Sequence, residues 1–239
     1  MSIYHVAIST LPEGKNDMSI FHIAIDGPVA GGKGTIARGL SDSLGIPCLD
    51  TGAIYRGIAV ACAPTYKINL SKDNINEAVV SALNRIKITA KVVNNVTRIY
   101  IDGKDVTDKL RENDISQIAS QVGTIPEVRK LCTKVSQELA ANQSLIAEGR
   151  DICSVVLPNA KHKFYLTAKV KIRAKRRYDE LIAKGRDITF KQVLRETKER
   201  DKRDSKKGGL VKTPDAVLID STNMTIDETV QHMLKLISR

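Results

Sequence analysis

The pattern of hydrophobic and polar residues predicts short buried strands that alternate with helices. Residues 21–25 form a short apolar run, which is typical of a strand buried on both faces of a sheet. Four later runs have the same character: residues 46–50, 144–148, 162–167 and 216–220. Between them apolar residues recur with helical spacing, as in the segment that follows Lys33 and stops at Gly45. This alternation predicts an α/β fold with a five-stranded parallel sheet flanked by helices.

Residues 67–111 follow a different pattern. Within them, residues 86–89 and 97–101 alternate between apolar and polar side chains, as strands with one buried face do. Asn94-Asn95 and Asp102-Gly103 are residue pairs that favour tight turns. The stretch therefore predicts a small inserted antiparallel β lobe, and its residues give no indication of catalytic chemistry.

Helical spacing returns after this insert and continues to the end of the chain. One predicted helix breaks at Pro126 and resumes after it. A second covers residues 169–184 and ends at Gly185, and a partner helix begins near Phe190. The closing helix is predicted over residues 225–238.

The turn after the first strand has the spacing of a phosphate-binding loop: Gly27, four residues, then Gly32 and Lys33. Glycines let backbone N–H groups approach a phosphate, and the first turn of the following helix adds its own N–H groups. Lys33 supplies a mobile positive charge for the outer phosphates. The alternative is a glycine-rich connection in some other α/β protein, which the flanking strand and helix disfavour. We expect nine residues to bind ATP: Gly27, Pro28, Val29, Ala30, Gly31, Gly32, Lys33, Gly34 and Thr35.

The residue after Lys33 is Gly34, at the position where most such loops carry a serine or threonine that binds magnesium. Thr35 follows one residue later. The sequence GKGT resembles the loop of nucleoside monophosphate kinases. In such a loop Mg²⁺ can be held by water and phosphates, so it needs no hydroxyl at position 34.

The formal charge of the 239 residues is +11, and it is concentrated in one segment. Residues 161–212 contain 19 Lys and Arg against 7 Asp and Glu, whereas the remainder is close to neutral. A basic segment of this kind indicates an anionic partner, which could be nucleotide phosphates, nucleic acid or a membrane surface.

Two further features bear on the compartment. No apolar run approaches the ~18 residues that cross a bilayer, and no secretory signal is recognisable. The four cysteines are widely separated and include no C-x-x-C pair: Cys48, Cys62, Cys132 and Cys153. Such a distribution is typical of cysteines that remain reduced thiols. We expect a cytoplasmic protein.

The sequences IDGP and GGKGT, with LDTGAIYR spaced behind them, resemble bacterial cytidylate kinase. The similarity runs from about Ile20 to the C-terminus. It implies a single P-loop kinase domain over residues 18–239, with a monophosphate-binding insert at about 60–140 and a short helical lid at about 167–187. Residues 1–17, which include a near-copy of residues 18–25, are an N-terminal extension to which we assign no role.

The resemblance also implies functions for individual residues. The catalytic cations would be Lys33, Arg150, Arg173 and Arg177, and we expect the lid arginines to lie apart in solvent before nucleotide binds. Mg²⁺ would be held through water near Glu148, where the family usually has aspartate. The residues expected to bind CMP are Thr51, Arg56, Ser120, Arg129, Arg150, Asp151, Arg200, Asp204 and Lys207.

Five further positions depart from the family pattern. Val29 and Ala30 stand where a serine or alanine and a glycine are common. Lys207 replaces an arginine, and Gly208-Gly209 replaces Ser-Pro. A lysine keeps the charge at position 207 but loses the bidentate fork of arginine.

The expected reaction is transfer of the ATP γ-phosphoryl group to CMP or dCMP, with Mg²⁺ as cofactor and with a monomeric enzyme. A related kinase that acts on UMP or another monophosphate would share the same loop and lid. A P-loop protein that binds nucleic acid through its basic segment is the alternative from another class. The chain has only nine aromatic residues among Phe and Tyr and no Trp, so it offers little for base stacking, and we expect neither a nucleic-acid nor a membrane partner.

Overall fold

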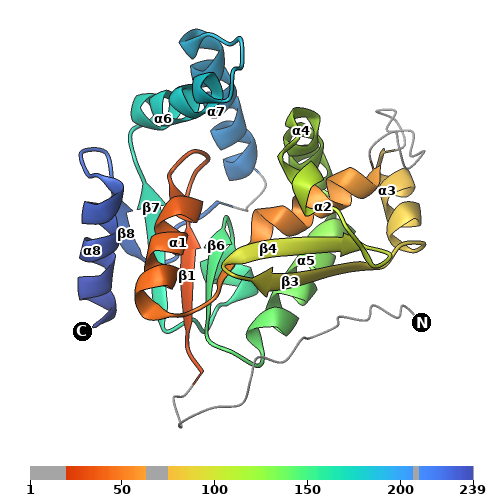
Figure 1. Cartoon of the computed structure of the whole chain (residues 1–239), viewed down its shortest axis with the longest axis horizontal. Coiled ribbons are helices and arrows are strands. Elements are labelled where there is room, and N and C mark those ends of the chain that lie inside the picture. The colour runs from red at the N-terminus through yellow and green to blue at the C-terminus, as the bar shows by residue number, and fades with distance from the viewer. Residues whose placement is uncertain (1–19, 63–74, 207–209, 239) are drawn as a thin grey trace. The chain divides into compact units, whose positions relative to one another are not determined.

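The computed structural model describes residues 20–62, 75–206 and 210–238, and its main feature is a five-stranded sheet (Figure 1). The strands are β1 (His22–Asp26), β2 (Cys48–Asp50), β6 (Leu145–Gly149), β7 (His162–Thr167) and β8 (Val217–Asp220), in the order β2-β6-β1-β7-β8. β7 pairs in parallel with both β1 and β8. The predicted sheet is confirmed, and the strand that ends near Glu148 lies beside the strand that precedes the phosphate loop, as expected from the sequence.

The apolar runs became strands because their side chains are buried on both faces. Ile23, Ala24 and Ile25 are fully buried in β1, and the first three residues of β6 are fully buried as well. β2 is shorter than the predicted residues 46–50. It begins after Pro47, which has no N–H to donate to a neighbouring strand.

The chain divides into two compact units, which are described separately. Among the described residues, the first contains residues 47–62 and 75–145, and the second contains residues 22–46, 146–206 and 210–238. In the second unit α1 (Lys33–Leu44) packs against α8 (Ile226–Ile237), and α6 (Val170–Ala183) packs against α7 (Phe190–Lys206). The α6–α7 pair is the helical hairpin that the sequence predicts, with the left-handed residue Gly185 ending its first arm.

The first unit contains the inserted lobe. A three-stranded sheet is formed by β3 (Ile88–Val93), β4 (Val96–Ile101) and β5 (Lys104–Asp105), with antiparallel pairing. Both predicted turns are confirmed, since Asn94, Asn95, Asp102 and Gly103 all have positive φ. The helices of this unit are α2 (Thr51–Cys62), α3 (Ile75–Leu83), α4 (Asn113–Val122) and α5 (Pro126–Ala140), with a 3₁₀ turn at Thr107–Arg111.

All four cysteines are buried and form no disulfide. Burial raises the pKa of the Cys62 thiol to about 11, so this thiol stays protonated at neutral pH. Within the described ranges, no helix is both long and apolar enough to cross a membrane.

α2 packs closely against the small sheet at Gly57. A Cβ on Gly57 would lie 2.5 Å from Cγ2 of Ile99 in β4, closer than real Cβ atoms come to a side chain. Gly57→Ala should therefore lower the free energy of unfolding by about 1–3 kcal/mol through overpacking, although alanine favours helix by about 1 kcal/mol. Chemical denaturation measures the change. In the double variant with Ile99→Ala, the cost of Gly57→Ala should shrink, and strictly additive costs would contradict this account.

Candidate functional site

The phosphate loop connects β1 to α1 and needs glycine at its first position. A Cβ on Gly27 would lie 2.0 Å from the Leu166 carbonyl oxygen in β7, so no larger residue fits beside the neighbouring strand. The Gly31 N–H donates to the Pro28 carbonyl and closes the turn. Gly32 is the N-cap of α1 and is left-handed, with φ 86°. The spacing recognised in the sequence thus forms a loop that leads into a helix N-terminus.

Ala30 is strained within this loop. Its φ is 56°, in the left-handed region. The other non-glycine residues with positive φ in the described ranges are Asn94, Asn95 and Asp102, residue types that tolerate this region. For alanine the conformation costs about 1–2 kcal/mol, so contacts elsewhere have to hold it.

Lys33 is the first residue of α1 and is almost completely buried. Its Nζ donates to the carbonyl oxygens of Gly27 (2.9 Å) and Pro28 (3.0 Å), which come from the loop itself. Burial, reinforced by the charge of Arg150, lowers the pKa of Lys33 to about 7, while Glu148 opposes this shift. A bound phosphate would raise the pKa again, because an anion favours the charged amine.

Asp26, at the end of β1, was not among the residues predicted for the site. Its carboxylate is buried and accepts hydrogen bonds from the backbone N–H groups of Ile152 (2.8 Å) and Cys153 (2.9 Å). These bonds fix the π-helical turn Ile152–Val156 against the strand that precedes the phosphate loop. Arg150 and Asp151 immediately precede this turn, so Asp26 sets their position.

Arg150 and Asp204, both predicted to bind the acceptor, form an ion pair with each other. Arg150 Nε lies 2.7 Å from Asp204 Oδ2, and both side chains are mostly buried. Asp151 beside it is buried, and Arg200 lies on α7 one turn before Asp204. The acceptor residues of the second unit are thus gathered by the end of β6 and by α7.

Glu148 lies near the end of β6, beside the start of α1. A Cβ on Gly34 would lie 3.4 Å from Glu148 Oε1, so the carboxylate lies next to the phosphate loop. No cluster of three or more metal-binding side chains occurs in the described part of the chain. A single carboxylate suits Mg²⁺ that is held mainly by substrate phosphates and water.

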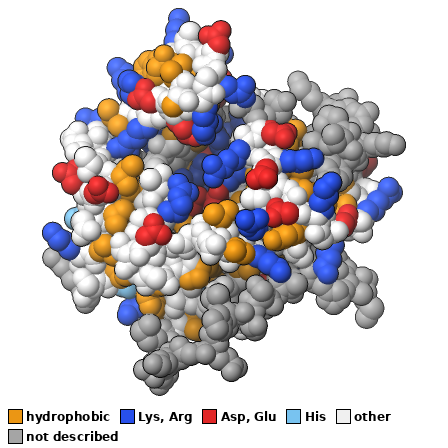
Figure 2. Space-filling view, viewed as in Figure 1, with side chains coloured by type: hydrophobic (Ala, Val, Ile, Leu, Met, Phe, Trp, Pro, Cys, Tyr) orange, Lys and Arg blue, Asp and Glu red, His pale blue; other side chains and the backbone are white. Residues whose placement is uncertain are grey.

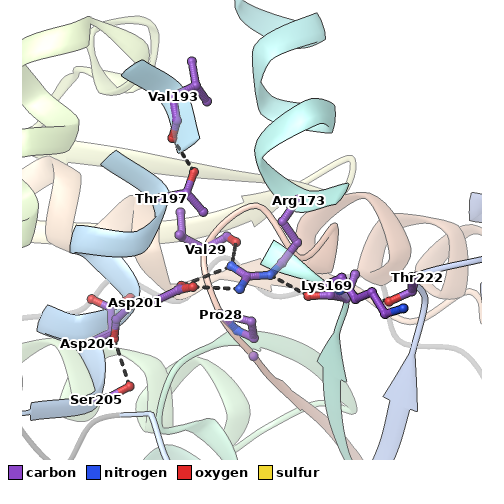
Figure 3. A network of polar contacts seen from close by, with 12 residues as sticks. Pro28, Val29, Lys169, Arg173, Val193, Thr197, Asp201, Asp204, Ser205 and Thr222 are labelled. Carbon is purple, nitrogen blue, oxygen red and sulfur yellow. Dashed lines mark hydrogen bonds and ion pairs between the residues drawn. The ribbon is translucent and has the colours of Figure 1, made fainter. Parts of the chain in front are cut away.

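The three arginines of α6 have three different sets of partners. Arg173 is buried and contacts Val29 of the phosphate loop and Asp201 of α7 (Figure 3). Arg176 donates to the Ser221 carbonyl (2.7 Å), and Arg177 pairs with Glu180 on the helix surface. The expectation that the lid arginines lie in solvent is wrong for Arg173, because its guanidinium is covered by α7 and the loop.

The basic segment is interspersed with acidic residues. Figure 2 shows Lys and Arg side chains alternating with Asp and Glu over the face in view. On α6, Lys175 pairs with Asp179, and Glu180 accepts from both Arg177 and Lys184. Such exposed pairs contribute little stability each, and they reduce the local excess of positive charge.

The remaining predicted acceptor residues belong to the first unit. Thr51 is buried at the start of α2, Ser120 lies in the last turn of α4, and Arg129 lies in the first turn of α5. Arg56 forms an ion pair with Asp50, whose other oxygen accepts from the backbone N–H of Ala53 at the start of α2. The buried Nε of Arg56 has no hydrogen-bond partner among the described residues.

Some predicted residues lie outside the described ranges, and some residues near the site were not predicted from the sequence. Lys207 and Gly208-Gly209 are outside the described ranges. Asp26, Asp50 and Asp201 were missed, although each is an acidic residue close to a predicted cation or loop. An acidic residue at a strand end, or one turn away from a predicted ligand, is the signal that could have found them.

The loop, the buried lysine at its helix and the arginines around it define a P-loop phosphate-binding protein of the α/β class. The profile of the cytidylate kinase family matches residues 23–239. The chain belongs to the cytidylate kinase family and is a nucleoside monophosphate kinase.

Individual relatives agree with this assignment over almost their whole length. The cytidylate kinase of Caldicellulosiruptor bescii is 42% identical over 221 residues, which cover 92% of this chain and 96% of the relative. The cytidylate kinase of Thermosipho melanesiensis is 42% identical over 90% of this chain and 95% of its own. That of Thermotoga maritima is 38% identical over 91% of this chain and 96% of its own.

Lys33→Met should abolish phosphoryl transfer and stabilise the fold at the same time. In the unfolded chain the pKa of Lys33 returns to about 10.4, against about 7 in the folded protein. Between these values the unfolded state binds more protons, so the stability of the natural protein rises with pH there. The gain from methionine should therefore be largest below pH 7 and should shrink as the pH rises towards 10. Linkage alone gives about 4–5 kcal/mol, and loss of the two hydrogen bonds of Lys33 reduces the net gain to about 2 kcal/mol.

Urea denaturation at pH 6.5, 8 and 9 measures this gain, and an ADP-release assay measures turnover. Lys171→Met, at an exposed position of α6, is the matched control and should show no pH-dependent gain. A Lys33→Met protein that is less stable than the natural one at pH 6.5 would contradict the account of a buried, destabilising charge.

Proposed function

We propose that this enzyme transfers the γ-phosphoryl group of ATP to CMP or dCMP, giving CDP or dCDP and ADP. The observation that carries the proposal is the buried Lys33 at the phosphate loop together with the arginines at the end of β6 and on α6 and α7. Membership of the cytidylate kinase family supports cytosine nucleotides as acceptors.

The chemistry needs charge neutralisation rather than a general base. A nucleoside monophosphate has a second phosphate pKa near ~6 and is largely dianionic at neutral pH, so it can attack without losing a proton to the protein. The transition state spreads negative charge over the transferred group. Lys33, Arg150 and Arg177 are the proposed cations that stabilise it directly, and Arg173 is proposed to act through its contact with the phosphate loop.

The proposed donor site is the phosphate loop from Gly27 to Thr35. Its N–H groups and the N-terminus of α1 would bind the ATP phosphates. Mg²⁺, when bound, would neutralise phosphate charge, and Glu148 would hold it through water. The absence of a hydroxyl at Gly34 is compatible with this arrangement, because phosphates and water supply the other ligands.

The proposed acceptor residues lie in both units. Arg56 fits a phosphate contact, since its buried Nε has no partner among the described residues while Asp50 holds the other end of its guanidinium. Asp204 is proposed to bind the ribose, and Asp151 the cytosine amino group. The full proposed set is Thr51, Arg56, Ser120, Arg129, Arg150, Asp151, Arg200, Asp204 and Lys207. We propose a monomeric, cytoplasmic enzyme.

A single assay tests the reaction. ADP release should be measured with Mg²⁺-ATP and each of CMP, dCMP, UMP, AMP and GMP. The proposal predicts kcat/KM values for CMP and dCMP well above those for the others. Equal or higher values for UMP would favour the related uridylate-type reaction instead.

Cytosine selectivity should depend on Asp151. An aspartate that accepts from the 4-amino group repels the 4-carbonyl of uracil and leaves buried polar groups unpaired. Asp151→Asn should therefore narrow the ratio of kcat/KM for CMP over UMP by about tenfold or more. Asp227→Asn, in the exposed first turn of α8, is the control and should leave the ratio unchanged. An unchanged ratio in Asp151→Asn would show that this residue does not recognise the base.

A further inference from the structure

Arg173 uses most of its hydrogen-bonding capacity on protein atoms. Its Nε donates to the Ala168 carbonyl (2.8 Å), Nη1 donates to the Val29 carbonyl (2.8 Å) and to Asp201 Oδ1 (3.1 Å), and Nη2 donates to Asp201 Oδ2 (2.7 Å). A guanidinium has five N–H groups, and these four hydrogen bonds use four of them. Only one N–H, on Nη2, remains for any other group among the described residues. An arginine bound in this way acts mainly by holding other atoms in place.

The atom it holds in the phosphate loop is the Val29 carbonyl oxygen (Figure 3). This carbonyl and the N–H of Ala30 belong to one planar peptide unit and point in opposite directions. Fixing the carbonyl on Arg173 therefore fixes the direction of the Ala30 N–H. The preceding carbonyls, of Gly27 and Pro28, are held by Lys33, so two cations bind three successive loop carbonyls.

This peptide unit needs support, because it leads into a strained residue. Ala30 has φ 56°, and the φ rotation of Ala30 is the rotation that would turn the Val29 carbonyl away. An alanine released from its contacts would prefer negative φ. The contact with Arg173 thus acts at the one position of the loop where the backbone would otherwise change conformation.

Asp201 is the residue that keeps Arg173 in place. Its carboxylate binds Nη1 and Nη2 together, in the bidentate geometry that orients a guanidinium most strongly. Its side chain is mostly buried on α7, where the pair is little screened by solvent. Among the described residues, Asp201 is the only carboxylate that contacts Arg173.

We propose that Asp201 is a positioning residue for ATP binding: it orients Arg173, which fixes the Val29–Ala30 peptide so that the phosphate loop is held in its phosphate-binding conformation. The proposed role of Asp201 rests on the proposed function, in which the phosphate loop binds ATP. The support is needed because position 30 is an alanine with positive φ and not a glycine.

Two substitutions test the proposal together. Asp201→Asn removes the charge and places an amide N–H opposite a guanidinium N–H, so the loop should populate its binding conformation less. The dissociation constant for an ATP analogue should rise about tenfold, since affinity falls in proportion to the competent population. Ala30→Gly alone gives the reference affinity for the double variant. In the double variant, Ala30→Gly should restore most of the affinity lost in Asp201→Asn, because glycine adopts positive φ without a Cβ penalty.

The measurement is isothermal titration of each variant with AMPPNP and MgCl₂, followed by steady-state KM values for ATP and CMP. KM for ATP should rise in Asp201→Asn while KM for CMP stays within about twofold. Glu199→Gln, on the exposed face of the same helix, is the matched control and should bind the analogue like the natural protein. If Asp201→Asn does not fold, Asp201→Glu, which displaces the carboxylate by one methylene, replaces it in the same cycle.

Three results would overturn the proposal. Unchanged analogue affinity in the Asp201 variant would show that the pair does not control the loop. A loss that Ala30→Gly fails to rescue would show that Arg173 acts on the phosphate directly. Equal losses for ATP and CMP would indicate general damage to α7. Failure of the proposed reaction is separate, since it would appear as absent turnover with CMP in the natural protein while the analogue titrations remain interpretable.

Discussion

Concentrated positive charge beside the phosphate loop is the constraint on which this structure depends. Like charges repel strongly where water is excluded. The lowered pKa of Lys33 reflects first its burial and then the repulsion by Arg150 and Arg200. Four carboxylates offset this charge, because each interacts electrostatically with a cation or accepts hydrogen bonds from backbone N–H groups: Asp26, Glu148, Asp201 and Asp204. Removing one partner of a buried pair costs more than the pair itself contributes, so these acids are as necessary to the site as the cations.

Charge counting along the sequence overstates the role of most basic residues. Lys175 and Lys184 lie in exposed pairs along α6, where each pair contributes about 0.3–0.5 kcal/mol and is screened by salt. Arg173, on the same helix, is buried and connects two other elements. The basic segment is therefore an ion-paired helical hairpin with a few buried cations, and its net charge is a poor guide to which residues matter.

The sheet and the phosphate loop could be predicted because local signals determine them. Short apolar runs marked the five strands, and the spacing from Gly27 to Lys33 marked the loop. The partners of individual side chains could not be predicted in the same way. Arg173 and Arg177 are identical residues one turn apart. Contacts with Val29, 144 residues away in sequence, and with Asp201 of α7 bury the first and not the second. The role of Asp26 likewise depends on N–H groups more than 120 residues away.

Helix α7 is where the donor and acceptor sides of the proposed reaction meet. Asp201 and Asp204 are three residues apart, so they project from the same face of the helix. One holds Arg173 and through it the phosphate loop, and the other holds Arg150 at the end of β6. A displacement of α7 would move both arginines together. Binding of one nucleotide can therefore change the affinity for the other only if α7 has two conformations and each nucleotide binds one of them more tightly. A shared element couples two sites only when it has two such states.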